Sequence, residues 1–324
     1  MIAKAVLAID PAAAAAKIEA AVREQVKGTL RRRGAVLGLS GGIDSSVVAA
    51  LLARALGPER VVALLMPERH SSPDSLRLGK LVADTLGVTA IVEDVAPALD
   101  GLGCYIRQDA AIRRVFPEWG AGWTCKLTLP SILDGERLNV FSLTVRDPAG
   151  EERRARLPLE AYLELVAATN LKQRTRKAIE YTHADRLTYA VAGTPNRLEY
   201  DQGFFVKNGD GAADVKPIAH LYKTQVYALA AYLGIPDEVR SRPPTTDTYS
   251  MEQTQEEFYF ALPWDRMDLC LYGLNHEVPA AEIAPAVGLT AEQVERVYKD
   301  IRSKRRATRY LHAPPLLVEI VEGV

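Results

Sequence analysis

Short apolar runs and apolar-rich helices alternate along the first hundred residues. After an alanine-rich helix predicted over residues 12–30, residues 35–39 form an apolar strand that stops at a glycine pair. Residues 45–56 then have the composition of a buried helix, closed by Gly57 and Pro58. The same order repeats in a strand, a helix and a strand, at residues 60–66, 71–87 and 89–95. This alternation predicts an α/β fold, a doubly wound parallel sheet flanked by helices that binds ligands at the carboxyl ends of its strands.

The middle of the chain breaks this rhythm. Residues 100–157 contain alternating segments on either side of the turn-like sequence RDPAGE, which predicts a β-hairpin or a small β-rich insertion. A long helix, a strand and a shorter helix are predicted next, over residues 159–186, 188–194 and 222–233. Residues 241–263 have no clear period and are predicted to form a mobile loop. Thr290 and Gln293 have the spacing of a capping box and begin the last predicted helix.

Length and composition limit the class of protein. The 324 residues, of which 48% are hydrophobic, suffice for one large core, so we expect one domain over residues 1–324 with the insertion at about 100–157. The 40 basic and 41 acidic residues give a formal charge of −1, which favours neither nucleic acid nor a membrane surface as a partner. Cys104, Cys125 and Cys270 fit neither a disulfide framework nor a zinc site, and no stretch resembles a signal peptide or a membrane span. We therefore expect a cytoplasmic protein.

The first chemical signal is the sequence SGGIDS, which lies between a predicted strand and a predicted helix. Backbone N–H groups of such a turn and the positive end of the helix form a nest for phosphate oxygens. Gly41 and Gly42 let the backbone approach the anion because a Cβ would occupy that space, and Ser40 and Ser45 can donate hydrogen bonds. Asp44 would repel a triphosphate unless a cation lies between them, so binding Mg²⁺ is its most economical role.

Other interpretations of this loop are weaker. The lysine of a Walker loop is missing, so transfer of a terminal phosphate is not indicated. The spacing of Gly38, Gly41 and Gly42 differs from the dinucleotide fingerprint, which argues against a dehydrogenase. The structural alternative is a tight turn in which Asp44 and Ser45 only cap the following helix.

SGGIDS resembles the pyrophosphate loop of the N-type ATP pyrophosphatases, which include NAD, GMP and asparagine synthetases. Downstream sequences are similar to successive motifs of the NAD synthetase family, namely NLKQRTR at 170–176, the stretch from GTPNRLE to HLYKTQV at 193–226, and RPPTTD at 242–247. The resemblance implies a single adenine-nucleotide alpha hydrolase-like ATP pyrophosphatase domain. It also implies a ligase that forms a carbon–nitrogen bond. Such a ligase adenylates the carboxylate of nicotinic acid adenine dinucleotide with ATP and Mg²⁺, and ammonia then converts the adenylate to NAD, with release of AMP and pyrophosphate.

The resemblance also implies roles for individual residues. ATP and its pyrophosphate would contact Gly38, Leu39, Ser40, Gly41, Gly42, Ile43, Asp44, Ser45, Thr194, Lys223 and Thr245. Mg²⁺ would be bound by Asp44 and Glu199. The dinucleotide would contact Arg174, Lys207 and Asp214, and Lys304 and Arg305 would be equivalents of a basic pair near the substrate. The implied catalytic residues are Asp44, Lys223 and Asp210, of which Asp210 would sit beside the reacting carboxylate and the incoming ammonia.

Some of these positions also have a rationale in the residues alone. Lys223 lies in the first turn of a predicted helix, where the macrodipole disfavours a cation, so a phosphate partner would explain it; a solvated lysine is the alternative. Glu199 follows a strand closely, at the edge where Asp44 also emerges, although either acid could pair with a surface base. Asp210 between two glycines is by itself an ordinary turn, and Arg174 could belong to an exposed basic helix face.

The chain departs from the family pattern in its loops. GTPN stands where the family has GTGN, and QTQEEFYFALPWDRMD replaces the usual acidic stretch. These changes leave the acyl substrate open, so a sister amide ligase for another carboxylate and a non-catalytic nucleotide-binding relative are alternatives. The chain has no sequence context for an amidase domain, so ammonia would come from solution or from a separate partner protein. From the resemblance alone, we expect a homodimer.

Overall fold

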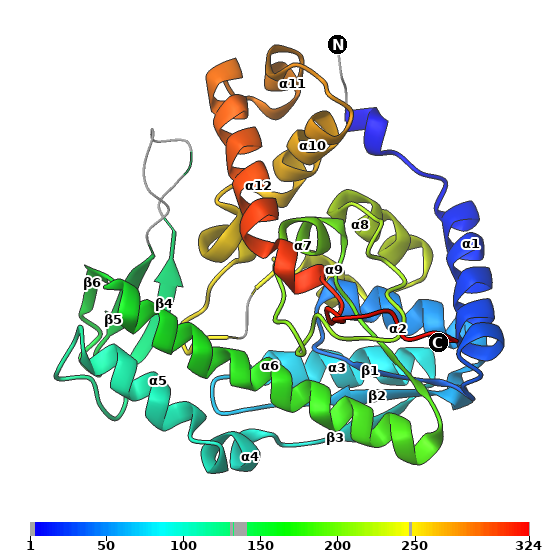
Figure 1. The fold of residues 1–324 in the computed structure, drawn as a ribbon, viewed down its shortest axis with the longest axis horizontal. Coiled ribbons are helices and arrows are strands. Elements are labelled where there is room, and N and C mark those ends of the chain that lie inside the picture. Colours follow the sequence, from blue (N-terminus) through cyan, green and yellow to red (C-terminus); the bar gives the residue numbers. More distant parts are fainter. Residues whose placement is uncertain (1–3, 130–131, 133–140, 246–247, 324) are drawn as a thin grey trace.

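A four-stranded parallel sheet lies at the centre of the computed structural model, which describes residues 4–129, 132, 141–245 and 248–323 (Figure 1). Its strands are β1 (Ala35–Gly38), β2 (Val61–Leu65), β3 (Thr89–Val92) and β7 (Ala190–Ala192), in the order β3-β2-β1-β7. All neighbours are parallel, and Val36 of β1 lies opposite both Val62 and Val191. The sheet grows from β1 to β3 on one side and adds β7 on the other, which confirms the predicted doubly wound class.

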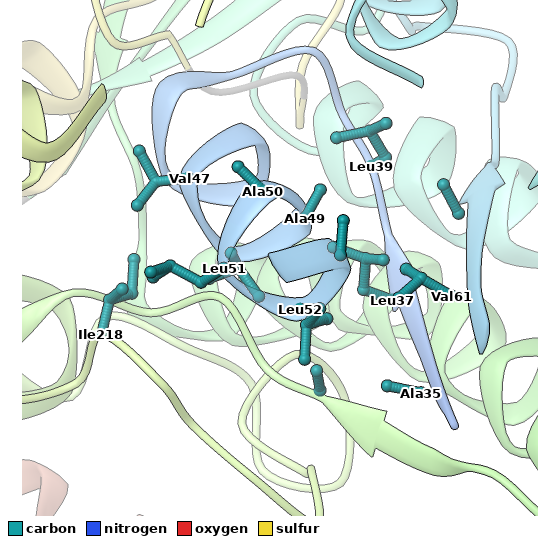
Figure 2. Close-up of a cluster of buried hydrophobic side chains, with 14 of the residues drawn as sticks. Ala35, Leu37, Leu39, Val47, Ala49, Ala50, Leu51, Leu52, Val61 and Ile218 are labelled. Atoms are coloured by element: carbon teal, nitrogen blue, oxygen red, sulfur yellow. The ribbon is translucent and has the colours of Figure 1, made fainter. Parts of the chain in front are cut away.

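Helices cover both faces of the sheet, and this explains why β1 and β2 are apolar throughout. Leu37 packs on one face, which is covered by α1 (Pro11–Arg23), α2 (Ile43–Leu56), α3 (Pro73–Leu86) and α8 (Lys223–Tyr232). Val36 points the other way, toward Ala184 of the 29-residue helix α6 (Leu159–Leu187). Figure 2 shows Leu37 with Leu51 and Leu52 of α2, in the cluster of buried side chains on the first of these two faces.

Capping residues mark where these helices begin and end. The Asp10 side chain accepts hydrogen bonds from the first turn of α1, and Ser72 does the same for α3. α1 continues into the π-helical segment η2 (Glu24–Thr29), which accounts for the predicted length to residue 30. Gly87 ends α3 in the left-handed conformation, with φ +65°. Two short 3₁₀ helices, η1 (Lys4–Leu7) and η3 (Pro58–Arg60), complete this region.

The expectation for residues 100–157 is only partly correct. Their first part is helical, as the end of α4 (Ala96–Gly101) and α5 (Cys104–Arg113), because α5 packs antiparallel on α6 and buries Ile112 against it. The β-rich part is an antiparallel sheet of β4 (Thr124–Thr128), β5 (Ser142–Arg146) and β6 (Glu152–Arg156). The predicted hairpin at RDPAGE joins β5 to β6. Residues 130–131 and 133–140 of the predicted insertion lie outside the described residues.

The rest of the chain forms a helical unit above the carboxyl edge of the sheet (Figure 1). Its helices are α7 (Arg197–Gln202), α10 (Trp264–Asn275), α11 (Ala280–Val287) and α12 (Ala291–His312), whereas α9 (Asp237–Ser241) packs on α8 in the core beside the sheet. The Thr290–Gln293 capping box of α12 is confirmed, whereas the sequence analysis did not identify α7, α10 or α11. Among the described residues of 242–263, Thr245 and Thr254 form an isolated bridge and Glu256–Phe260 forms the π-helical turn η5. Within the described residues, no helix is long and apolar enough to cross a membrane.

Candidate active site

A cavity of about 600 Å³ lies at the carboxyl ends of β1, β2 and β7, where a doubly wound sheet is expected to bind its ligand. Segments that are far apart in the sequence form its walls, drawn from residues 38–45, 64–76, 162–180, 192–210, 239–259 and 308–311. Figure 1 shows how these segments meet, with α6 on one side and the end of α12 on the other. The sheet therefore supplies the loops, and the helical unit closes the cavity over them.

The SGGIDS turn forms one wall of the cavity. The Ser40 and Ser45 hydroxyls lie 3.2 Å apart, and Ser45 donates to the Gly42 carbonyl at 3.1 Å. Gly42 is the N-cap of α2 and provides no side-chain cap, so the N–H groups of the first turn keep their capacity to bind an anion. The Asp44 carboxylate points to Asn196 and Lys223 instead of capping α2, which contradicts the purely structural alternative for this residue.

The two glycines of this turn have different surroundings. Gly41 has φ +75°, and a Cβ there would lie 2.7 Å from the Ser75 carbonyl oxygen, so its small size lets the turn pack against α3. Gly41 is also not among the described residues that line the cavity, which corrects the expected reason for its presence. Gly42 does line the cavity, together with Gly38, Leu39, Ser40, Ile43, Asp44 and Ser45.

Asp44, Glu199 and Lys223 meet beside this turn. Lys223 is 1% exposed, and its Nζ forms an ion pair with Asp44 Oδ2, so the alternative of a solvated lysine is wrong. Asn196 joins the two acids, because its Nδ2 donates to Asp44 Oδ1 at 2.9 Å and its backbone N–H donates to Glu199 Oε2 at 3.0 Å. Gln255 Nε2 donates to Glu199 Oε1 at 3.0 Å. Two carboxylates that are distant in the sequence thus converge at the phosphate-binding turn.

Burial disfavours negative charge in this cluster. It raises the pKa of Glu199 to about 8, and the nearby Asp44 acts in the same direction. Burial also acts to lower the pKa of Lys223, but Asp44 and Glu199 outweigh it, and the pKa lies above its ordinary value. Mg²⁺ prefers oxygen ligands and commonly binds one or two carboxylates together with substrate phosphates. Asp44 and Glu199 fit that ion, which would relieve the repulsion between them.

Four further expected ligands line the same cavity, namely Thr194, Thr245, Arg174 and Lys207. Arg174 Nε donates to the Lys207 carbonyl at 3.2 Å. Lys207 Nζ donates to two carbonyl oxygens at the end of α12, at 2.8 and 3.1 Å. Arg174 is therefore not part of an unattached basic face, since it joins α6 to the loop that carries Lys207. Thr246 and Asp247, which end the RPPTTD motif, lie outside the described residues.

Asp210 also lines the cavity. Its Oδ1 accepts the Val206 N–H at 2.7 Å, and burial raises the pKa of its carboxyl group. Lys177 and Glu180 form an ion pair of 2.6 Å in the same wall, and the positive charge of Lys177 partly opposes the effect of burial on Asp210. This ion pair was not predicted from the sequence, although the i, i+3 spacing of its two residues on a predicted helix indicates such a pair.

Three expected substrate residues are held elsewhere. Asp214 accepts the Val191 N–H at 2.8 Å and the Tyr181 hydroxyl at 3.2 Å, so its carboxylate fixes the end of β7. Arg305 binds both carboxylate oxygens of Asp201, at 2.6 and 2.7 Å, and Lys304 pairs with an acid one turn earlier in α12 at 2.7 Å. These side chains are not among the described residues that line the cavity. All three have partners within the chain, with Asp214 exposed and Lys304 and Arg305 half-buried.

Asn196 and Gln255 complete the acidic cluster, and the sequence analysis did not single out either of them. Asn196 caps α7, since its side chain accepts the N–H groups of Leu198 and Glu199. Its N-x-x-E spacing to Glu199 is a capping-box signal that could have identified both the helix and the asparagine. Gln255 had no local signal, because only the folding of residues 241–263 over the cavity brings it to Glu199.

Comparison with known proteins agrees with this geometry. A family model described as NAD synthase matches residues 14–113 and 149–309. Over 318 residues, 98% of this chain and 95% of the other, the chain is 63% identical to the NH(3)-dependent NAD(+) synthetase of Rhizobium meliloti (strain 1021). It is 36% identical to that of Thermotoga maritima over 86% of this chain and 90% of the other.

Among solved structures, the NH3-dependent NAD synthetase from Campylobacter jejuni superposes on 96% of this chain and all of its own, with a TM-score of 0.62 and 22% identity, which supports the fold alone. The sequence relatives carry the assignment further, because the family model and the 63% identical relative both span most of the chain. The chain belongs to the NAD synthase family.

Proposed function

We infer that this chain is an ammonia-dependent NAD synthetase, a ligase that uses ATP to adenylate the carboxylate of nicotinic acid adenine dinucleotide and amidates it with ammonia. The observation that carries this inference is the convergence of Asp44, Glu199 and Lys223 at the open N-terminus of α2. The names of the relatives supply the substrate and the nitrogen donor.

The first half of the reaction is activation of the carboxylate. A carboxylate oxygen attacks the α-phosphorus of ATP, the bond to the bridging oxygen breaks, and pyrophosphate leaves. We propose that the Gly42–Ser45 turn binds the departing pyrophosphate through N–H groups and hydroxyls. Lys223 would offset the negative charge that develops on the phosphates. Mg²⁺, held by Asp44 and Glu199, would supply further positive charge.

The second half is attack by neutral ammonia on the acyl adenylate. The adenylate carbonyl carbon gains the nitrogen, AMP leaves, and the nitrogen loses a proton. Asp210 is the candidate to accept that proton or to hold the ammonia, because its buried carboxyl group lines the cavity and has a raised pKa. Water must be kept out, or it would hydrolyse the adenylate. Residues of the loops at 203–215 and 241–263 line the cavity, so these loops are the candidates to exclude water.

The direct test is to incubate purified protein with ATP, Mg²⁺, ammonium and nicotinic acid adenine dinucleotide. We expect NAD, AMP and pyrophosphate in equal amounts, measured by chromatography. Pyrophosphate release with another carboxylic acid but not with this dinucleotide would instead indicate a sister amide ligase. A protein that binds ATP but releases no pyrophosphate with any acid would be a non-catalytic relative. Glutamine in place of ammonium is the control for the nitrogen donor.

We further propose that the chain is a single cytoplasmic domain that acts as a homodimer. The domain proposal is supported by the shared core of the inserted sheet with α5 and α6. The homodimer is supported by the family resemblance, and the cytoplasmic location by the spacing of the three cysteines. Sedimentation equilibrium on the purified protein measures the oligomeric state directly, and a monomer at all concentrations would contradict the homodimer.

A further inference from the structure

Lys172 lies on α6, in the turn whose neighbours Asn170, Gln173 and Arg174 line the cavity. Lys172 is not among the described lining residues, and it is 1% exposed. Its side chain therefore lies behind the cavity wall. A fully buried lysine is unusual unless every one of its charged N–H groups has a partner.

The Lys172 ammonium has three acceptors, which equals its number of N–H donors. Nζ donates to Glu68 Oε1 at 2.9 Å, to His70 Nδ1 at 3.0 Å and to the Thr248 carbonyl oxygen at 2.8 Å. Glu68 and His70 belong to the connection from β2 to α3, whereas Thr248 belongs to the loop after α9. One side chain of α6 thus joins two separate loops of the cavity.

Most of the polar side-chain atoms around Lys172 have hydrogen-bond partners within the same group of residues. Glu68 has a second acceptor oxygen, which receives the Tyr105 hydroxyl at 2.9 Å. Burial acts to raise the pKa of Glu68, but the positive charge of Lys172 outweighs it, so the carboxylate stays charged. Burial and Lys172 lower the pKa of His70 to about 4, which leaves its Nδ1 free to accept a hydrogen bond at neutral pH.

Both joined loops contribute to the cavity. Pro67 and Ser71 flank the Glu68–His70 side, and Thr248 and Tyr249 lie on the other side with Thr245, the expected ATP contact. The far end of the second loop is attached to the inserted sheet, because the Cys125 N–H donates to the Ser250 hydroxyl at 2.9 Å. The bond from Lys172 to the Thr248 carbonyl therefore fixes Thr248, which lines the cavity together with Tyr249 and Thr245.

A buried ion pair alone would give little reason for this arrangement, since a well-packed apolar pair of similar size is often equally stable. A hydrogen bond from a charged donor to a backbone carbonyl, by contrast, fixes the position of a loop. We propose that Lys172 is a positioning residue, which holds the cavity wall at Thr248 and Tyr249 against α6 so that the cavity can bind ATP. This proposal rests on the proposed function, and it adds a residue behind the site that determines the affinity for ATP.

The test compares Lys172→Met with the double variant Glu68→Gln/Lys172→Met. The single variant leaves Glu68 buried without its cation and is expected to be less stable. The double variant removes both charges, so its melting temperature should recover toward that of the unchanged protein, whereas the anchor on Thr248 stays lost. We expect both variants to raise the KM for ATP about tenfold, with a change of less than about twofold in the KM for ammonium.

Two further measurements separate the possible outcomes. ATP binding by calorimetry, with no second substrate, should weaken by the same factor, and this readout does not depend on which acid the enzyme uses. Val22→Ala, a core change in α1 remote from the cavity, is the control for a lower melting temperature without a kinetic change. A double variant that recovers both stability and normal affinity for ATP would show that Lys172 is purely structural and would overturn the proposal. Glu68→Gln alone keeps the lysine and can be measured if the lysine variants do not fold. It should retain normal affinity for ATP, because the bond from Lys172 to Thr248 remains. A tenfold loss of affinity in Glu68→Gln would also count against the Thr248 anchor.

Discussion

The adjacent glycines of the SGGIDS turn illustrate how one motif combines two requirements. Gly41 adopts φ +75° and packs against α3, whereas Gly42 has φ −83°, a conformation open to any residue, and lines the cavity. Packing of the turn therefore depends on the first glycine, and access of the phosphates depends on the second.

Alanine at each position should separate these effects. Gly41→Ala should cost about 1–3 kcal/mol in the free energy of unfolding, because the left-handed backbone and the contact with Ser75 both oppose a Cβ. Gly42→Ala should unfold at nearly the normal urea concentration but bind ATP more weakly. Urea unfolding and calorimetric ATP titration measure the two quantities. Equal loss of stability in both variants would contradict this division.

Asp44 is the residue on which the proposed chemistry depends most. Asp44→Asn removes the negative charge that faces Lys223 and is expected to reduce pyrophosphate release by about 10²- to 10³-fold. Asp74→Asn is a matched control, because Asp74 is an exposed acid that pairs with Arg77 on the surface. Release should be measured under saturating Mg²⁺ and ATP. Normal turnover by Asp44→Asn would be incompatible with the proposed role.

At the scale of elements, a contact between α10 and α8 links the helical unit to the fold around the parallel sheet. Asp268 of α10 caps α8, since it accepts the backbone N–H groups of Lys223 and Thr224 at 3.2 and 2.7 Å and the Thr224 hydroxyl at 2.7 Å. The position of Lys223 in the cavity thus depends on a helix that the sequence analysis did not identify. Burial raises the pKa of Asp268 to about 6.

This pKa predicts a dependence of stability on pH. A carboxyl group whose pKa is higher in the folded chain than in the unfolded chain stabilises the fold fully at low pH, and that contribution is lost as pH rises through the folded value. The part of the stability that Asp268 contributes should therefore fall between about pH 4 and pH 6. Urea unfolding across this range should show a shallower fall for Asp268→Asn. Asp237→Asn, at an exposed acid of α9, should keep the slope of the unchanged protein.

At the scale of the whole molecule, the inserted sheet packs on α6, the helix that also covers one face of the parallel sheet. Leu143 of β5 and Leu127 of β4 pack with Ile112 of α5, Leu165 of α6 and Tyr249 of the cavity loop. The family model matches residues on both sides of 114–148 but not that stretch, yet the relative that is 63% identical aligns over 98% of the chain and therefore spans it. The inserted sheet thus packs against α6 and against Tyr249 of the cavity.

Unfolding should consequently be one cooperative transition. Leu143→Ala should lower the free energy of unfolding by about 2–5 kcal/mol, as is usual for a buried leucine, and should shift the whole transition, followed both by tryptophan fluorescence and by helical circular dichroism. Two separate transitions, with only one displaced by the substitution, would mean that the insertion is an independent domain.

The sequence alone predicted the parallel sheet, the capped helices and the phosphate-binding turn, because each depends on residues close together in the chain. Apolar periodicity identifies β1, α2 and β2, and capping residues such as Ser72 and Thr290 mark helix ends. The motifs also placed Thr194, Arg174 and Lys207 at the cavity, and the geometry agrees. The helical start of the predicted insertion was missed, because the contact of α5 with α6 decides it.

Only the tertiary structure decided which charges meet. Asp44, Glu199 and Lys223 converge because the carboxyl ends of β1 and β7 adjoin and α10 fixes the start of α8, and no local pattern carries that distance. The same folding pairs half-buried Lys304 and Arg305 with acids of the chain and leaves Asp214 exposed, with its carboxylate bonded to the Val191 N–H. Local chemistry therefore determined the core strands, the helices beside them and the turn that can bind a phosphate, while contacts between distant segments determined the remaining helices and which charged residues share the cavity.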